Sequence, residues 1–284
     1  MMVQTVQATA GAPEANGYLR TAYGIVRMRA TERGLREVWL PRWRGVAQTS
    51  GSANGKAAEM AGDTRTWRID REGGPQARIH LEQALIELDE YFAGTRRQFA
   101  VALDPVGTDF LLQAWRAVAD VPYGETRSYG EIAQIVGLPD AARAVGRANA
   151  INPLAPFVPC HRIVGSDGRL TGYGPGLPMK ERLLRMEDAL PDGSDDFDAW
   201  ITRLRARAGL AAEASLYLGV RRMRTYCLAG CERSRAAADL PARFFTSLES
   251  ASEAGFAPCP RCQAPASRRV SQPALELKLS GPRC

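Results

Sequence analysis

The sequence predicts an α+β protein in which short strands come first, helices follow, and a small cysteine-rich unit comes last. Residues 18–40 alternate apolar and polar side chains around a glycine, a pattern typical of two or three short strands. Residues 128–150 contain two short helical segments joined by a tight turn. Four cysteines form two close pairs between residues 227 and 262. Together these three observations define the fold class.

The first hundred residues predict a small strand-and-helix unit. Residues 1–16 are expected to be a disordered lead, and the small, polar stretch 45–64 is expected to be a loop. A helix is predicted over residues 76–94, which end in a glycine. Its apolar positions recur at helical spacing at Ile79, Ala84, Leu88 and Phe92. His80 lies on the same stretch and is assigned no chemistry.

The middle of the chain predicts a helix-turn-helix. One helix runs through residues 107–121, and a second begins where Ser128 and Glu131 have the spacing of a capping box. Asp140 is the expected N-cap of the next helix. Arg143 lies in the first turn of that helix, where the helix dipole disfavours a cation. It either serves something outside the helix or is a plain exposed arginine.

Composition limits the classes of protein that are possible. No run of about 18 apolar residues occurs, and residues 1–17 lack the pattern of a secretion signal, so we expect a cytoplasmic protein without a membrane span. Residues 201–284 carry 14 Lys and Arg against 6 Asp and Glu. Such an excess indicates either a polyanionic partner, usually nucleic acid, or a solvated basic face.

A cysteine beside a histidine marks the first candidate site. Cys160 and His161 stand in the segment PCHRIV, and the chain has only one other histidine. A thiol becomes a nucleophile as a thiolate, which a neighbouring base can provide. Adjacent side chains on a strand point apart, so the pair needs a turn or a bridging water. Glu181, Glu187 and Asp188 could orient the histidine, and spacing does not choose between them. The alternative is a buried, inert thiol.

Several motifs in order resemble one family. They are PYGETRSYGEIAQIVG, ARAVGRANAINP, PCHRIV, TGYGPGL and KERLLRMED, and the similarity runs from about residue 18 to residue 190. The chain resembles the O6-alkylguanine-DNA alkyltransferase family. The resemblance implies an antiparallel-sheet subdomain followed by a helical subdomain with the helix-turn-helix. It also implies a methylated-DNA–[protein]-cysteine S-methyltransferase that acts once, without a cofactor, on O6-alkylguanine and O4-alkylthymine in double-stranded DNA.

The same resemblance implies roles at the matched positions. Cys160 resembles the alkyl acceptor, His161 the base that activates it through a water, and Glu187 the carboxylate that orients the histidine. Asn152 resembles the hinge asparagine that ties the active-site turn to the recognition helix.

Four further residues are expected to contact DNA or the base. Arg143 resembles the arginine that fills the gap left by the flipped guanine, and Tyr129 the tyrosine that presses on the target phosphate. Tyr173 resembles the tyrosine that lines the base pocket, and Arg162 is expected to contact DNA as well.

The second candidate site is a metal site. Cys227 and Cys231 are separated by three residues, Cys259 and Cys262 by two, and the pairs by 27. Four thiols in two close pairs fit a tetrahedral zinc ion. Cys284, near the end of the chain, is expected to be a free thiol.

The region around these cysteines resembles the zinc-binding domain of the bacterial adaptive-response protein Ada, in which the first cysteine also accepts a methyl group from a DNA phosphotriester. Cys227 would hold that place. The family usually has CRPSC where this chain has CLAGC, so Leu228 and Gly230 replace the arginine and the serine. The alternative is a purely structural zinc domain that docks on DNA.

The expected organisation is a monomer of several segments. They are a lead (1–16), an N-terminal subdomain (17–100), an alkyltransferase subdomain (101–190), an acidic linker (191–196), a zinc domain (197–266) and a tail (267–284). A competing hypothesis is a DNA-binding protein that senses lesions without repairing them. A cysteine hydrolase is a third, weakened by the adjacent helix-turn-helix and by the lack of an evident oxyanion loop.

Overall fold

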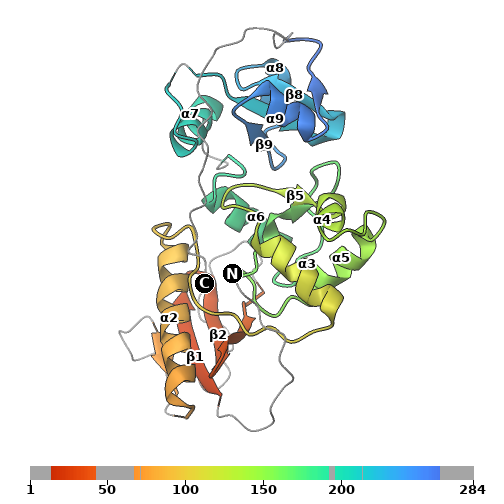
Figure 1. The fold of residues 1–284 in the computed structure, drawn as a ribbon. Helices are drawn as coiled ribbons and strands as arrows, with labels where there is room; N and C mark the ends of the chain where they lie inside the picture. Colours follow the sequence, from red (N-terminus) through yellow and green to blue (C-terminus); the bar gives the residue numbers. More distant parts are fainter. Residues whose placement is uncertain (1–13, 43–66, 71, 192–195, 213, 263–284) are drawn as a thin grey trace, which may run out of the picture.

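A computed structural model describes residues 14–42, 67–70, 72–191, 196–212 and 214–262. Three parts follow one another along the molecule, with the helical part between a strand-rich part and a second small sheet (Figure 1). The expected loop 45–64, the tail 267–284 and Cys284 lie outside the described residues. Within the described residues, no helix combines the length and apolar character that a bilayer crossing needs.

The N-terminal part is a four-stranded antiparallel sheet in the order β3-β2-β1-β4. Its strands are β1 (Ala15–Thr21), β2 (Gly24–Thr31), β3 (Gly34–Trp39) and β4 (Trp67–Ile69). The strands predicted over residues 18–40 are confirmed as three. β1 begins inside the segment 1–16, so the expected end of the lead is two residues too late.

Helix α2 (Pro75–Phe92) packs against β1 and β2 and confirms the predicted helix (Figure 1). One of its expected apolar contacts is wrong, because Ile79 is 55% exposed. The buried stripe instead follows positions three to four residues apart, and Ile79 lies two residues from its nearest members, on another side of the helix. The buried apolar positions are Ala77, Leu81, Ala84, Leu85, Leu88 and Tyr91.

The middle part contains the helix-turn-helix. Its helices are α3 (Asp109–Ala119), α4 (Tyr129–Ile135), α5 (Ala142–Ala150) and α6 (Leu177–Met186). Helices α4 and α5 pack on each other and on α3. The two short strands β5 (Arg127–Ser128) and β6 (Ile163–Val164) pair in parallel. This pairing joins the start of α4 to the segment that follows Cys160.

The start of α4 is fixed by the predicted capping box. The Ser128 hydroxyl accepts a hydrogen bond from the Glu131 backbone N–H, and the Glu131 carboxylate accepts one from the Ser128 N–H at 2.7 Å. The predicted cap of α5 is wrong, because Ala141 and not Asp140 holds the N-cap position, without a side-chain bond. The Ala141 N–H closes a turn to the Leu138 carbonyl, so Asp140 lies within that turn, before the helix begins.

The C-terminal part is a second four-stranded sheet, in the order β10-β8-β7-β9, preceded by helix α7 (Phe197–Arg207). Its strands are β7 (Tyr217–Val220), β8 (Thr225–Leu228), β9 (Arg243–Phe245) and β10 (Ala257–Pro258). Between them lie the 3-10 turn η3 (Arg221–Met223) and the short helices α8 (Glu232–Arg235) and α9 (Leu248–Glu253). Apolar residues of α7 and β7 form a separate core, including Trp200, Leu204 and Leu218.

Replacing Ser128 with alanine is expected to lower the free energy of unfolding by about 1 kcal/mol, because one backbone N–H of α4 loses its acceptor. Urea denaturation measures the change. Ser166→Ala, in an exposed segment, is the control and should stay within about 0.5 kcal/mol of the parent chain. Equal effects of the two substitutions would contradict the capping role.

Candidate functional site

Cys160 lies in a short 3-10 turn, η2 (Cys160–Arg162), and its side chain is buried. Asn152 organises this turn from the end of α5. Its Nδ2 donates to the Val158 carbonyl at 2.8 Å and to the Cys160 Sγ at 3.1 Å, and its Oδ1 accepts from the Leu154 N–H at 3.0 Å. An N–H that points at sulfur favours the thiolate over the thiol. The helix-turn-helix and the nucleophile are therefore linked through one amide.

His161 follows in the same turn and is fully buried. Its Nε2 lies 2.9 Å from the Glu187 Oε1. Among the described residues, no hydrogen-bond partner is found for its other ring nitrogen, Nδ1, or for the buried hydroxyl of Tyr173. The rings of His161 and Tyr173 meet edge to face with 6.3 Å between centroids. Two polar atoms near the thiol are thus available to water or to a substrate.

Glu187, at the end of α6, receives hydrogen bonds from three other segments of the chain, one of which is the turn η2 that holds both His161 and Arg162. Besides His161, Tyr91 on α2 donates its hydroxyl at 2.7 Å and the Gly124 N–H donates at 3.2 Å. Arg162 donates through Nε and Nη2, both at 2.8 Å. The structure therefore brings Cys160, His161, Asn152 and Glu187 together, and Glu187 is the member that the surrounding segments converge on.

Charge explains the ionisation of this buried cluster. Burial alone would raise the pKa of Glu187, but the interactions of its carboxylate with His161 and Arg162 outweigh it and hold that pKa well below its usual range. Burial lowers the pKa of His161, and the Glu187 carboxylate opposes this shift. Burial raises the pKa of the Cys160 thiol, and the Asn152 hydrogen bond opposes it. The histidine therefore stays neutral and able to accept a proton.

Lys180 is a second buried charge near the thiol. Its ammonium donates to the Ile163 carbonyl at 2.5 Å and to the Thr171 carbonyl at 2.8 Å. Burial lowers its pKa to about 8, while the Cys160 sulfur opposes the shift. The lysine holds together the two ends of the segment that follows the active-site turn.

The four residues expected to contact DNA take different positions. Arg143 is exposed on α5, the second helix of the helix-turn-helix. Tyr129 is half-buried at the start of α4. The Tyr129 hydroxyl accepts a hydrogen bond from the Thr171 hydroxyl at 3.1 Å. Arg162 does not fit its expected role, because its guanidinium is buried and bound to Glu187 and to the Val121 carbonyl. It belongs to the carboxylate cluster and not to a DNA-facing surface.

Some contributors to the cluster are absent from the sequence analysis. Tyr91 comes from the N-terminal part, and no local pattern marks it. Gly124 has a φ of 73°, and a side chain there would strike the Glu187 carbonyl. The position of Lys180 near this site could have been predicted from the sequence. It lies seven residues before Glu187, which places it two turns away on the same face of a helix.

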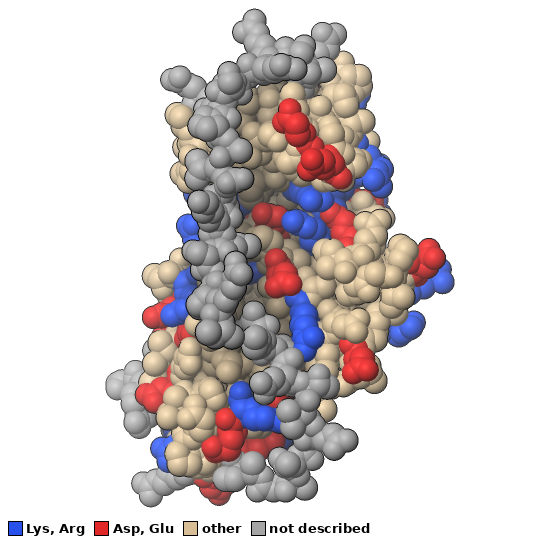
Figure 2. All heavy atoms as spheres, viewed as in Figure 1, with Lys and Arg blue, Asp and Glu red and all other residues tan. Residues whose placement is uncertain are grey.

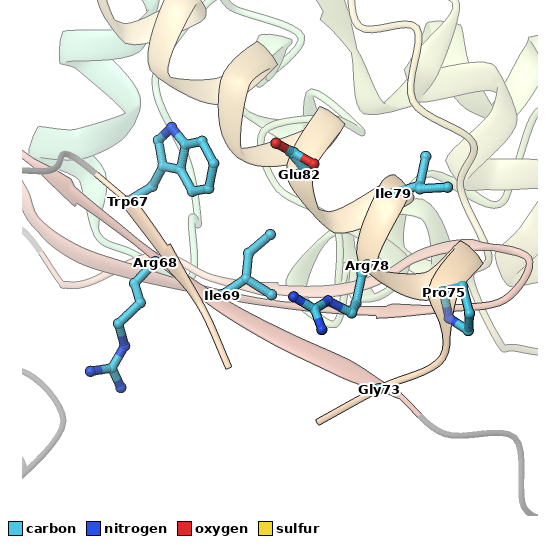
Figure 3. A pocket seen from close by; sticks show the side chains of 8 residues that line it. All are labelled: Trp67, Arg68, Ile69, Gly73, Pro75, Arg78, Ile79 and Glu82. Carbon is cyan, nitrogen blue, oxygen red and sulfur yellow. The ribbon is translucent and has the colours of Figure 1, made fainter. Parts of the chain in front are cut away.

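A large hollow lies elsewhere, between β4 and the first turns of α2 (Figure 3). It measures about 660 Å³, and its lining includes Trp67, Arg78, Ile79 and Glu82. None of its eight lining residues belongs to the cluster around Cys160. The size of this hollow therefore says nothing about the chemistry of the thiol.

The four C-terminal cysteines come together in the second sheet. All four sulfurs lie within 4.8 Å of one another. Cys227 is on β8, Cys231 precedes α8, and Cys259 and Cys262 follow β10. Tetrahedral zinc with bonds of about 2.3 Å separates its sulfurs by about 3.8 Å, so a small contraction of this cluster would accommodate the ion. The donor set and the spacing fit zinc.

Each of the two regions that hold these sites is similar to a known family. Residues 109–189 match the family model described as 6-O-methylguanine DNA methyltransferase, DNA binding domain. A methylated-DNA–protein-cysteine methyltransferase of Mycobacterium leprae is 56% identical over 123 residues, which are 43% of this chain and 74% of the relative. The chain belongs to this methyltransferase family.

Other members of the family are similarly close. The protein of the same name from Methanosarcina acetivorans is 53% identical over 107 residues, 38% of this chain and 69% of that protein. A structure of Mycobacterium tuberculosis OGT in complex with DNA is 39% identical and matches 60% of this chain and 90% of its own, with a TM-score of 0.45.

Residues 202–264 match a different family model, the metal binding domain of Ada.

Replacing Glu187 with glutamine is expected to lower the free energy of unfolding by about 3 kcal/mol at pH 7, because Arg162 keeps its charge in a buried place without a counter-charge. The folded pKa of Glu187 is lowered, so its contribution is present above the unfolded value of about 4.3 and is lost as pH falls below it. The difference between the two proteins should narrow by about 1 kcal/mol at pH 3.5.

Urea denaturation at both pH values measures this difference. Glu181→Gln on the same helix is the control, since its ion pair with Arg185 is partly exposed and should contribute less than about 1 kcal/mol. A pH-independent difference for Glu187→Gln would contradict the assignment of a lowered pKa.

Zinc removal tests the cysteine cluster. The chain is expected to bind one zinc ion, and chelation should make four more thiols reactive and lower the melting temperature, because metal binding contributes to folding. Cys227→Ser should lose the metal, while Cys160→Ala should retain it. Metal analysis and thiol titration of the purified proteins measure these outcomes, and zinc retained by Cys227→Ser would contradict the four-cysteine site.

Proposed function

We propose that this protein repairs double-stranded DNA by transferring the alkyl group of an O6-alkylguanine to the sulfur of Cys160. The observation that carries the proposal is the buried Asn152–Cys160 contact beside the His161–Glu187 pair, in a chain of the methyltransferase family. The family relatives bear the name of this activity.

The proposed step forms one bond and breaks one. The thiolate sulfur attacks the alkyl carbon, the bond from that carbon to guanine O6 breaks, and its electron pair leaves with the base, which then takes up a proton. A thioether has no simple route back to a thiol, so each molecule acts once. The bonds formed and broken in this transfer require no cofactor.

The cluster supplies what this step needs. His161 takes the thiol proton through a water at its Nδ1, and the Glu187 carboxylate stabilises the imidazolium that forms. The Asn152 N–H stabilises the thiolate, and the Lys180 ammonium adds positive charge to the same site.

The base has to leave the duplex to reach a buried thiol. We propose that α5 approaches the minor groove, with the exposed Arg143 entering the space that the nucleotide leaves. Tyr129 lies at the start of α4 and would contact the backbone, while the buried hydroxyl of Tyr173 would face the base. O4-alkylthymine presents the same alkyl–oxygen bond and is included as a substrate.

The C-terminal part is proposed to be a zinc domain that binds DNA. Its cysteine cluster and the match to the metal binding domain of Ada support zinc. Methyl transfer from a phosphotriester to Cys227 is a second candidate function, which the resemblance of this region to Ada implies. On the face that Figure 2 shows, basic and acidic side chains are interspersed over the upper and middle parts. Among the described C-terminal residues, the basic side chains visible on this face are thus not gathered into one patch.

The proposal includes the setting of the activity. We place the protein in the cytoplasm, where thiols stay reduced, and expect it to act as a monomer on DNA with alkylated bases. The proposed division is a subdomain over 17–100, the alkyltransferase subdomain over 101–190 and a zinc domain over 197–266, joined by the linker 191–196. Lesion sensing without repair is not favoured, because the nucleophile, its base and the carboxylate are all present.

Mass spectrometry after incubation with methylated DNA tests the proposal. The duplex carries both O6-methylguanine and methyl phosphotriesters, and zinc is present. The peptide that contains Cys160 is expected to gain one methyl group. Its mass should increase by about 14 Da, because CH3 replaces the hydrogen of the thiol. Cys160→Ala should abolish this transfer and keep DNA binding, because the fold around the turn needs no sulfur.

The same measurement separates the alternatives. A second methyl group on the peptide that contains Cys227 would establish phosphotriester repair, and its absence would leave the zinc domain with a structural and docking role. No methyl group on either peptide, with DNA binding intact, would overturn repair in favour of lesion sensing.

A further inference from the structure

The end of α6 is covered by the C-terminal part of the chain. Three successive backbone carbonyls there, at residues 187, 188 and 189, each accept a hydrogen bond from a residue beyond the linker. The donors are Arg207 Nη1 to the Glu187 carbonyl at 2.7 Å, Trp200 Nε1 to the Asp188 carbonyl at 3.0 Å, and the Ala242 N–H to the Ala189 carbonyl at 3.1 Å.

The Glu187 carbonyl matters because Glu187 is the C-cap of α6, and a helix leaves its last four carbonyls without partners inside the helix. The Asp188 and Ala189 carbonyls belong to the turn that follows. An arginine near that end supplies donors and interacts favourably with the helix dipole. In this chain the residue at the end of α6 is Glu187, whose side chain holds His161. The cap therefore acts on the backbone of a residue of the alkyl-transfer site.

Arg207 also reaches a second segment of that site. Its Nη2 donates to the Gly124 carbonyl at 3.2 Å, and the Gly124 N–H donates to the Glu187 carboxylate. The Tyr123 hydroxyl donates to the Met186 carbonyl at 2.9 Å, next to the same place. One guanidinium thus ties the turn at residues 123–124 to the end of α6, on either side of the Glu187 carboxylate.

The C-terminal part holds this guanidinium in place. Arg207 is half-buried, and its Cζ lies 4.5 Å from the centre of the Phe244 ring. Its helix, α7, packs through Trp200 and Leu204 on the core shared with β7. The C-terminal part therefore carries Arg207 and holds its side chain on Phe244, while the guanidinium binds the alkyltransferase subdomain.

A second contact fixes how the two parts meet. Arg221 is buried and pairs with Glu131 at 2.6 Å, while its Nη2 donates to the Thr126 carbonyl at 2.7 Å. Arg243 pairs with the same Glu131. Glu131 is the carboxylate of the capping box of α4, so the C-terminal part contacts both the helix-turn-helix and the end of α6.

We infer that Arg207 is a positioning residue for alkyl transfer: it is supplied by the C-terminal domain and keeps Glu187, and through it His161, aligned with Cys160. This inference rests on the proposed function. It makes the C-terminal domain a part of the alkyl-transfer site, in addition to any role of its own cysteines.

Arg207→Ala tests the inference in the full-length, zinc-loaded chain. The single-turnover rate of methyl transfer from a duplex oligonucleotide with one O6-methylguanine is measured at saturating DNA, well below the melting temperature of each variant. A decrease of at least about tenfold is expected, because small displacements of reacting groups reduce rates strongly. The dissociation constant for the same duplex should not change.

Two further variants distinguish positioning from a loss of stability or charge. Arg205→Ala removes the same charge from the same helix, but Arg205 donates to Ala214 within the C-terminal part, so the rate should match the parent chain. Arg207→Lys keeps the charge and reaches one carbonyl at a time, so an intermediate rate is expected. If Arg207→Ala does not fold, the lysine variant decides the question.

Each result has one meaning. Slow transfer by Arg207→Ala with normal DNA affinity, beside a normal Arg205→Ala, supports the inference. A rate within about twofold of the parent, a rate lost only through weaker DNA binding, or a parental rate for Arg207→Lys overturns it. If the parent chain itself transfers no methyl group to Cys160, the proposed function fails first and the inference falls with it.

Discussion

The carboxylate of Glu187 is the buried negative charge on which the site depends. It accepts hydrogen bonds from four residues in three other segments of the chain: His161 and Arg162 in the turn η2, Tyr91 on α2, and Gly124. A buried carboxylate keeps its charge only where opposite charges and donors surround it. Helix α2, the turn that holds Cys160 and the end of α6 are therefore held together by one ionised group.

Much of the fold follows from local patterns in the sequence. The capping box at Ser128 and Glu131 fixes where α4 begins, and alternation places three strands before residue 40. These features depend on neighbours in the chain, so periodicity and capping chemistry reveal them. The errors arise where local signals compete, as at Asp140, where a turn to Leu138 delays the helix. Ile79 shows the same limit, since the helical pattern does not tell which side faces the sheet.

The candidate site could be predicted only in part. Motif order brought Cys160, His161, Asn152 and Glu187 into one hypothesis, and the geometry places these side chains together. The remaining contributors act across long separations, as Tyr91 does from 96 residues away. Arg162 is predicted to contact DNA because it stands near the nucleophile in the sequence, but its side chain is buried. Such partners depend on tertiary packing, which leaves no periodic trace in the sequence.

The covered end of α6 has a consequence for how this chain can be divided. Removing the C-terminal part would leave the carbonyls of residues 187–189 without the donors Arg207, Trp200 and Ala242. The two parts are therefore not structurally independent domains, although each matches its own family model. Grafting this zinc domain onto another alkyltransferase would have to carry these contacts with it.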